Sequence, residues 1–376
     1  MTIRCLHTAD LHLDAPFPNW GEKEGVRRAD LLKSFERIVT LAIKNDVQLL
    51  LISGDLFDSP HPQAATVSRV QAELKRLVDR GITPVLLPGT HDPFAPKNSI
   101  YRRESFPGIL LSEAQLSEPV HLPLKGVNCY LYGVAYQSGK AEELLPAMQR
   151  RDLPGYHIGL LHGSRRGSPE WNYRHKDLPF DLADLVALRL DYVALGHYHN
   201  FAVLQDENSR NIAAYPGSPE GKRFGEDGPR YCALVTLSAA GVQIEALEVN
   251  TRTLAEEEID LSGIVTLEGA IAEIRRLANP DLILRLRLTG TVEIPLALPS
   301  LLAACRDDFF WLELLDSTRL YDSAYARRIE HEETVRGLFV RRMRRLIAES
   351  PPERRPVVEE AFREVLARFA ATGGER

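Results

Sequence analysis

Five short apolar runs, each followed closely by aspartate or histidine, constrain the fold more than any other feature of this sequence. Unbroken apolar runs are typical of strands that are buried on both faces, as in parallel sheets. Ligands of open α/β sheets bind beyond the carboxyl ends of such strands. We therefore expect one crevice to collect side chains from all of these segments. The runs, with the polar residues that follow them, are 3–6 with Asp10 and His12, 47–52 with Asp55, 83–87 with Thr90, His91 and Asp92, 157–161 with His162, and 192–195 with His197 and His199.

Helical patterns between the first three runs indicate a βαβαβ order. Apolar residues recur at helical spacing over 31–43 and again over 67–78. This order predicts a largely parallel sheet that is covered by helices on both faces. Later strands are closely spaced, so the second half of this region is expected to be rich in sheet. Those strands are predicted at 128–134, 211–215, 231–237 and 242–249.

The character of the chain changes near residues 250–260. An amphipathic helix is predicted over 266–277, and an alternating strand with its leucines on one packed face over 282–288. Another helix and strand follow, and from about residue 317 the chain is helical and rich in arginine. We predict an α/β protein with a first domain at 1–255, a small α/β domain at 256–318 and an Arg-rich helical tail at 319–376.

Composition narrows the functional class. The chain has 376 residues and a net charge of −6, which does not indicate a free-standing, strongly basic nucleic-acid-binding protein, although local basic patches are compatible with it. The four cysteines are far apart, so we expect reduced, buried thiols. Asp10 lies where a signal peptide would need an apolar core, and no apolar run approaches the roughly 18 residues of a membrane span. We therefore expect a cytoplasmic protein.

Taken singly, the polar residues at the strand ends carry little information, because Asp10 or Asp55 alone suits a turn or a helix N-cap. Turns and helix caps do not explain why such residues occur at all five strand ends. His197 and His199 are a stronger signal than a single residue, because alternate side chains of an extended segment point the same way. Mixed Asp and His ligands suit Mn, Fe, Co or Zn. A shared carboxylate would hold two metals about 3.5–4 Å apart for phosphoryl displacement. Asp55 is the natural candidate for that bridge.

The motifs ADLHLD, SGDLFD, GTHD, LLHG and GHYH, in this order, resemble the signature of the calcineurin-like metallophosphoesterases. The chain is similar in particular to the SbcD/YhaO-type DNA repair exonucleases, through TADLHLDAPF, the GHYH pair, YPGSPEG at 215–221, and a second domain with a helical tail. The resemblance implies a β-sandwich flanked by helices, with a small α/β capping domain and a C-terminal helical hairpin. It also implies a metal-dependent hydrolase that acts on DNA as the exonuclease subunit of a DNA repair complex.

The resemblance further implies a two-metal site with Mn²⁺ as the expected cofactor, at which a metal-activated water attacks the phosphate. His91 would lie beside the scissile phosphate and stabilise charge or protonate the leaving oxygen, and Asp92 would orient His91. The implied metal ligands are Asp10, His12 and His199 at one metal, Asp55 as the bridge, and His162 and His197 at the second metal.

One position departs from the family pattern. The usual motif is Gly-Asn-His-Asp, and its Asn completes the shell of the second metal, whereas this chain has Thr90. The threonine side chain is shorter and offers only a hydroxyl oxygen. We expect the second metal to bind more weakly, or a water to fill the gap.

Four charged residues near the motifs also need an interpretation. Asp14 could orient His12, whereas Asp58 fits a solvated loop or a capping position. Lys222 and Arg223 could contact a phosphate of a DNA backbone, although such a pair is more often part of a solvated turn.

The tail contains two amphipathic segments, at 334–349 and from residue 358, on either side of Ser350-Pro351-Pro352. On their own, these segments fit equally a hairpin packed on its own protein and a docking element for the helices of a partner. The resemblance favours docking of residues 319–376 on an SMC-like coiled-coil ATPase, with arginines that also reach DNA phosphates. It also suggests a homodimer.

The same residues allow two alternatives to a DNA nuclease. A phosphoesterase for a nucleotide or another small phosphodiester would use the same metal centre, and the acidic net charge favours it slightly. A non-catalytic scaffold subunit that only docks partners has Thr90 as its support, but the otherwise intact ligand set opposes it.

Overall fold

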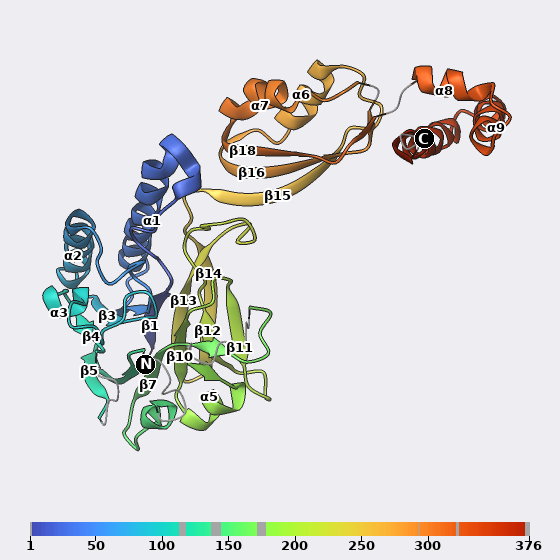
Figure 1. Ribbon diagram of the computed structural model, residues 1–376. Coiled ribbons are helices and arrows are strands. Elements are labelled where there is room, and N and C mark those ends of the chain that lie inside the picture. Colours follow the sequence, from blue (N-terminus) through green and yellow to red (C-terminus); the bar gives the residue numbers. More distant parts are fainter. Residues whose placement is uncertain are drawn as a thin grey trace. The chain divides into compact units, whose positions relative to one another are not determined.

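The computed structural model describes residues 2–112, 118–136, 144–170, 178–292, 294–320 and 323–372. The chain forms two compact units, Met1–Thr253 and Leu254–Arg376 (Figure 1). The division into three domains that the sequence suggested stays a prediction. Among the described residues, no helix is both long and apolar enough to cross a membrane.

Two six-stranded mixed sheets form the centre of the first unit. In the first sheet β1 to β4 run parallel, while β13 pairs antiparallel with both β1 and β14. In spatial order its strands are β14 (Gly241–Glu248), β13 (Tyr231–Ser238), β1 (Ile3–Thr8), β2 (Leu49–Ser53), β3 (Thr83–Leu87) and β4 (Ile109–Leu110).

The second sheet has a parallel centre and antiparallel edges. Strands β6, β7, β10 and β12 run parallel, and the edge strands β5 and β11 pair antiparallel with their neighbours. In spatial order the strands are β11 (Ala202–Gln205), β12 (Asn211–Tyr215), β10 (Tyr192–Gly196), β7 (Tyr156–His162), β6 (Val127–Val134) and β5 (Val120–Leu124).

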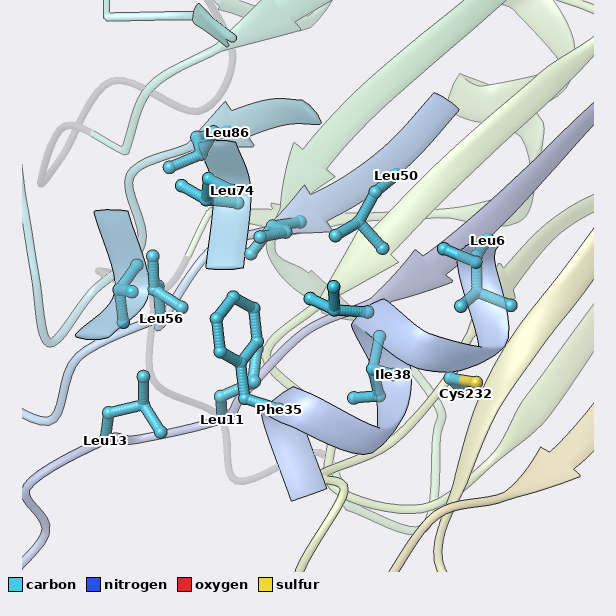
Figure 2. Close-up of a cluster of buried hydrophobic side chains, with 14 of the residues drawn as sticks. Leu6, Leu11, Leu13, Phe35, Ile38, Leu50, Leu56, Leu74, Leu86 and Cys232 are labelled. Atoms are coloured by element: carbon cyan, nitrogen blue, oxygen red, sulfur yellow. The ribbon is translucent and has the colours of Figure 1, made fainter. Parts of the chain in front are cut away.

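The sheets pack face to face because the strands of the first sheet are apolar on both faces. Successive side chains of a strand point to opposite faces. In β2, Leu49 and Leu51 therefore join Leu131 of the second sheet in one buried cluster. Leu50 points the other way and packs near Phe35 in a cluster beneath the helices (Figure 2). The two helices over this face are α1 (Glu24–Lys44) and α2 (Ala64–Val78).

The prediction of one largely parallel sheet with helices on both faces is wrong. The βαβαβ order did produce the parallel strands β1, β2 and β3, but both helices lie on the same face. The second sheet occupies the other face, since the apolar side chains there can be buried by strands as well as by helices. The β-sandwich flanked by helices that the motifs implied is what the structure shows.

Shorter elements cover the outer face of the second sheet. Helix α5 (Leu182–Leu188) begins with a capping box between Asp181 and Asp184, and it packs with Met148 against Val193. The remaining short elements of this unit are η1 (Pro18–Lys23), α3 (Ile100–Arg103), η2 (Leu145–Met148), β8 (Ser164–Arg165) and β9 (Pro179–Phe180).

The second unit begins with a small three-stranded sheet in the order β15-β16-β18. As predicted, the leucines of β16 share a buried face: Leu284, Leu286 and Leu288 pack with Ile274 and Leu301 of two helices. The elements are β15 (Thr253–Asp260), α6 (Leu267–Arg275), β16 (Asn279–Thr289), β17 (Thr291–Val292), α7 (Leu298–Cys305), η3 (Arg306–Asp308), β18 (Phe309–Asp316) and β19 (Arg319–Leu320).

Three helices end the chain: α8 (Ser323–Glu330), α9 (Val335–Glu349) and α10 (Arg355–Thr372). Thr334 caps α9 by accepting a hydrogen bond from the backbone of Gly337, and the helix ends at Ser350, before two prolines. Phe339 packs with Phe362, so α9 and α10 close on each other as the predicted hairpin.

Candidate metal centre

The loops that follow β1 and β2 run side by side and bring the first two motifs together. The backbone N–H of Asp10 donates to Gly54 (3.1 Å), and that of His12 donates to Asp55 (3.0 Å). Asp10, His12 and Asp55 all have positive φ, of 53°, 47° and 51°. Such strained backbone persists only where neighbouring contacts fix it. The hydrogen bonds between these two loops therefore fix the backbone that carries the three side chains.

Two glycines allow the strands to come this close. A Cβ at Gly89 would collide with the Asp55 side chain and backbone, and a Cβ at Gly196 would collide with the carbonyl of Ser53. The ends of β2, β3 and β10 can therefore meet only because these positions lack side chains.

The expected ligands lie in overlapping clusters at the adjoining strand ends. The ligand atoms of Asp10, His12 and His199 lie within 4.8 Å of one another, and so do those of Asp10, Asp55 and His162. Oδ2 of Asp55 is 3.8 Å from Nε2 of His12 and 3.4 Å from Nε2 of His162. Asp55 therefore lies between the two sets of histidines, the position that a bridging ligand requires.

His12 provides the clearest test of whether a cation fits here. Its Nδ1 lies 3.0 Å from Asp58, while its Nε2 is buried and has no hydrogen-bond partner among the described residues. Burial lowers the pKa of His12 to about 3, so the ring is neutral and can donate its lone pair. A histidine held by a carboxylate at one nitrogen, with the other free, is typical of metal ligation. The residues present therefore fit a divalent cation.

The charges of the site also favour a bound cation. Burial raises the pKa of Asp10 to about 6, and it acts in the same direction on Asp55. At Asp55, however, His162, His12 and His91 together outweigh burial and hold the pKa well below its usual value. Burial lowers the pKa of His162, but Asp55 and Asp10 together with the carbonyl of Ser53 outweigh burial and raise that pKa to about 10. Without metal, a proton on His162 supplies the positive charge that a divalent cation would otherwise bring.

The two histidines after β10 are held in different ways. The backbone N–H of His197 donates to both carboxylate oxygens of Asp10, at 3.0 and 2.9 Å, and its ring lies 5.3 Å from the ring of His162. Nδ1 of His199 lies 2.9 Å from Glu226, whose side chain is buried. Each ring thus lies beside the cluster to which it was expected to contribute.

Glu226 was not recognised in the sequence, although the loop that carries it was. Burial raises its pKa, but the hydrogen bond and charge of His199, together with Lys222, outweigh burial and lower the pKa to about 2. This carboxylate stays ionised and leaves Nε2 of His199 for a metal. The sequence signal that could have identified Glu226 is its place in a loop that lies close in sequence to His197 and His199.

The roles expected of Asp14 and Asp58 are exchanged in the structure. Asp14 accepts hydrogen bonds from Gln63 (2.7 Å) and Thr66 (2.6 Å) at the start of α2, so it anchors that helix. Asp58 is the carboxylate that contacts His12. The expectation that Asp14 orients His12 was wrong, because its positive φ of 69° belongs to a loop that turns toward α2.

The segment after β3 places Thr90, His91 and Asp92 in three different environments. Oγ1 of Thr90 donates to Asp55 (3.1 Å) and lies 3.3 Å from Nε2 of His162. The side chain of His91 is half exposed, and its ring lies 4.6 Å from that of His12. Nδ1 of His91 is 3.2 Å from the carbonyl of Asp58. Thr90 therefore faces the candidate ligands Asp55 and His162, and His91 faces the open side.

Asp92 anchors this loop. Its carboxylate accepts hydrogen bonds from Gly89 (2.8 Å), Phe57 (3.0 Å) and the hydroxyl of Tyr101 (2.6 Å). Burial raises the pKa of Asp92 to about 7. The orientation of His91 that we expected from Asp92 comes instead from the Asp58 carbonyl, because the three donors around Asp92 lie on the buried side of the loop.

A pocket of about 670 Å³ opens over the cluster, and Lys222 and Arg223 line it together with His12, His91 and His199. Nε of Arg223 pairs with Glu226 at 3.2 Å. Both basic residues predicted to contact phosphate are therefore at the site.

A buried polar network holds the loop that carries these residues. Arg27 of α1 is fully buried, and its guanidinium donates to Glu220 (3.2 Å), to the carbonyl of Gly221 (2.7 Å) and to Asp30 (3.1 Å). The hydroxyl of Ser34 donates to the same Glu220 at 2.7 Å. Helix α1 thereby fixes the backbone immediately before Lys222. No motif or spacing in the sequence pointed to this network.

The match of the chain with a known family decides its identity. The profile of the family described as calcineurin-like phosphoesterase matches residues 3–201, which include all five motifs. The chain belongs to this family. Its sheets, its Asp and His clusters and their spacing are thus those of a metallophosphoesterase with residues for a divalent-metal site.

Curated relatives include proteins with and without an assigned role. The chain is 29% identical over 300 residues to "Uncharacterized metallophosphoesterase YhaO" of Bacillus subtilis, covering 76% of this chain and 71% of that protein. It is 31% identical over 226 residues to "DNA double-strand break repair protein Mre11" of Sulfurisphaera tokodaii, covering 57% of this chain and 53% of that protein. It therefore spans only about half of that relative.

Two further similarities are more distant. The chain is 26% identical over 273 residues to a subunit of the nuclease SbcCD of Bacillus subtilis, covering 62% of this chain and 66% of that protein. Among solved structures, the calcineurin-like phosphoesterase YfkN of Bacillus subtilis aligns with 66% of this chain and 90% of that chain, at 14% identity and a TM-score of 0.38.

The contacts of His12 and His199 generate a first prediction. Asp58→Asn and Glu226→Gln keep the shapes of the two carboxylates but remove their charge, so each should lower affinity for Mn²⁺ by about 10-fold or more. Isothermal titration of the metal-free protein with Mn²⁺ measures this. Asp79→Asn is the matched control, because Asp79 pairs with Lys75 on exposed helix α2. Unchanged affinity in both site variants would contradict the assigned contacts.

Proposed function

We propose that this protein is a metal-dependent phosphodiesterase that acts on DNA, as the exonuclease subunit of a DNA repair complex. The observation that carries the proposal is the position of Asp55 between His12 and His162, which fits a centre with two cations. The similarity to relatives named as a break-repair protein and a nuclease supports DNA as the substrate. The exposed His91 supports a substrate larger than the pocket itself.

Each residue of the site would have a separate role in metal binding or catalysis. Two divalent cations, with Mn²⁺ as the first choice, would supply charge for the phosphate and a more acidic water. Asp10, His12 and His199 would hold one cation, His162 and His197 the other, and Asp55 both. His91 is held at Nδ1 by the carbonyl of Asp58, so its Nε2 is directed to the substrate side, where the protonated ring can donate to the leaving oxygen.

The second prediction tests the substrate and the bridge together. Wild-type protein should degrade end-labelled duplex DNA in the presence of Mn²⁺. Asp55→Ala should reduce the rate by about 100-fold or more, because the shared ligand of both cations is lost. Asp79→Ala, at an exposed carboxylate, should leave the rate unchanged.

Two results would count against DNA hydrolysis. Cleavage of bis(p-nitrophenyl) phosphate without DNA degradation would favour the alternative of a small phosphodiester. Absence of both activities in a protein that binds Mn²⁺ would favour the scaffold alternative.

Thr90 is proposed to weaken the second cation site. Its hydroxyl already lies between Asp55 and His162, so the place of a ligand is filled, but by a neutral oxygen on a shorter side chain. A third prediction follows: Thr90→Asn should tighten the weaker of two Mn²⁺ binding phases, and Thr90→Val, which keeps the shape without the oxygen, should weaken it further. Titration calorimetry resolves the phases. Equal binding in wild type and Thr90→Asn would contradict the proposal.

The tail is proposed to dock an SMC-like coiled-coil ATPase. The hairpin of α9 and α10 is closed by Phe339 and Phe362, yet three apolar residues of α9 remain outside it. Val335, Leu338 and Leu346 are 79%, 57% and 46% exposed. Their spacing places them along one side of the helix, where a partner helix could cover them.

A fourth prediction uses these exposed residues. Replacing Val335, Leu338 and Leu346 together by aspartate should abolish co-purification with the SMC-like ATPase of the same organism, because the apolar contact is lost while the hairpin interior is unchanged. Metal binding should remain normal. Val186→Asp is the control, since Val186 is similarly exposed on α5 of the first unit. Association that survives the triple change would rule out this face as the docking surface.

A further inference from the structure

We propose that Lys222 binds a non-bridging oxygen of the substrate phosphate inside the metal pocket, and that Arg223 instead supports the loop. This inference rests on the proposed phosphoester hydrolysis but does not depend on DNA being the substrate. It assigns to one residue the recognition of a phosphate group, whichever alcohol that phosphate carries.

The first support is the position of Lys222. The pocket that it lines is also lined by His12, His91 and His199, so a phosphate bound beside these histidines would lie in the same pocket as Lys222. Lys222 is partly buried, whereas the side chain of Arg223 is 81% exposed. Of the two cations that line the pocket, the lysine is therefore the less exposed to solvent.

The second support is the difference in pairing. Arg223 already has a carboxylate, since its Nε lies 3.2 Å from Glu226. The backbone N–H of Lys222 donates to the same Glu226 at 2.8 Å, but in the described part of the chain its ammonium has no ion-pair partner. A partly desolvated cation that has no direct ion pair is unfavourable, and an anion that enters the pocket relieves that cost.

The third support is the rigidity of the loop. The two residues before Lys222 are Glu220 and Gly221, and both are bound by the buried guanidinium of Arg27. The residue four positions after Lys222 is the buried Glu226, which is held by His199. The loop is thus fixed on both sides of the lysine. A cation presented on fixed backbone loses little freedom when a phosphate binds, as recognition of a small anion requires.

The electrostatic surroundings agree with this role. Burial lowers the pKa of Lys222, and attraction by Glu226 and Asp58 opposes that change. With divalent cations held by the candidate ligands, a phosphate oxygen between those cations and Lys222 would meet positive charge on both sides.

The experiment compares Lys222→Met, Lys222→Arg and Arg223→Met in the full chain. Inorganic phosphate is titrated calorimetrically into each protein after loading with Mn²⁺. Lys222→Met should weaken phosphate binding by about tenfold or more, the usual value of one charge-assisted hydrogen bond. Lys222→Arg should bind nearly as tightly as wild type, and Arg223→Met should resemble wild type. Affinity for Mn²⁺ should be the same in wild type and both Lys222 variants, and KM for bis(p-nitrophenyl) phosphate should rise in Lys222→Met but not in Lys222→Arg.

Several outcomes would overturn the assignment. They are phosphate binding that is unchanged in Lys222→Met, an equal loss in Arg223→Met, and loss of Mn²⁺ together with phosphate in Lys222→Met. Failure of the Mn²⁺-loaded wild type to bind phosphate would overturn it as well. Lysine-dependent phosphate binding in a protein that does not degrade DNA would leave the assignment standing and refute only DNA as the substrate.

Discussion

The burial of Asp10 and Asp55 at the meeting point of the two sheets is the constraint on which the rest of the site depends. Both side chains are almost inaccessible, and carboxylates in such a position need positive charge nearby. Without metal, a proton on His162, next to Asp55, supplies part of it. A bound divalent cation would replace that proton, so metal affinity and folding stability are linked through the same two carboxylates.

The position of this site could be predicted from the sequence because the residues that follow parallel strands meet at one edge of the sheet. Every expected ligand was next to an apolar run, and the structure collects all of these segments at adjoining strand ends. The arrangement of layers was less predictable. Leu49 and Leu50 are equally apolar, yet one faces a sheet and the other faces α1. Hydrophobic periodicity reports that a face is buried but does not report which element buries it.

The residues that orient the ligands were the ones that sequence reasoning missed. Asp14 seemed the natural partner of His12 because it is only two positions away, but Asp58, from the loop after β2, holds that role. Glu226 likewise contacts His199 from a separate loop. Ring-orienting contacts depend on backbone turns such as the positive φ of Asp14, and these turns leave little trace in composition or spacing.

The network around Arg27 shows what such distant contacts achieve. A buried ion pair is weak support for stability, since apolar residues of similar volume often stabilise a core as well. Apolar residues could not, however, donate hydrogen bonds to both the carbonyl of Gly221 and the carboxylate of Glu220, as Arg27 does. Glu220 also accepts from the backbone of Thr251, near the end of the first unit. The loop before Lys222 and the segment that leads into the second unit are therefore joined by hydrogen bonds to one buried carboxylate.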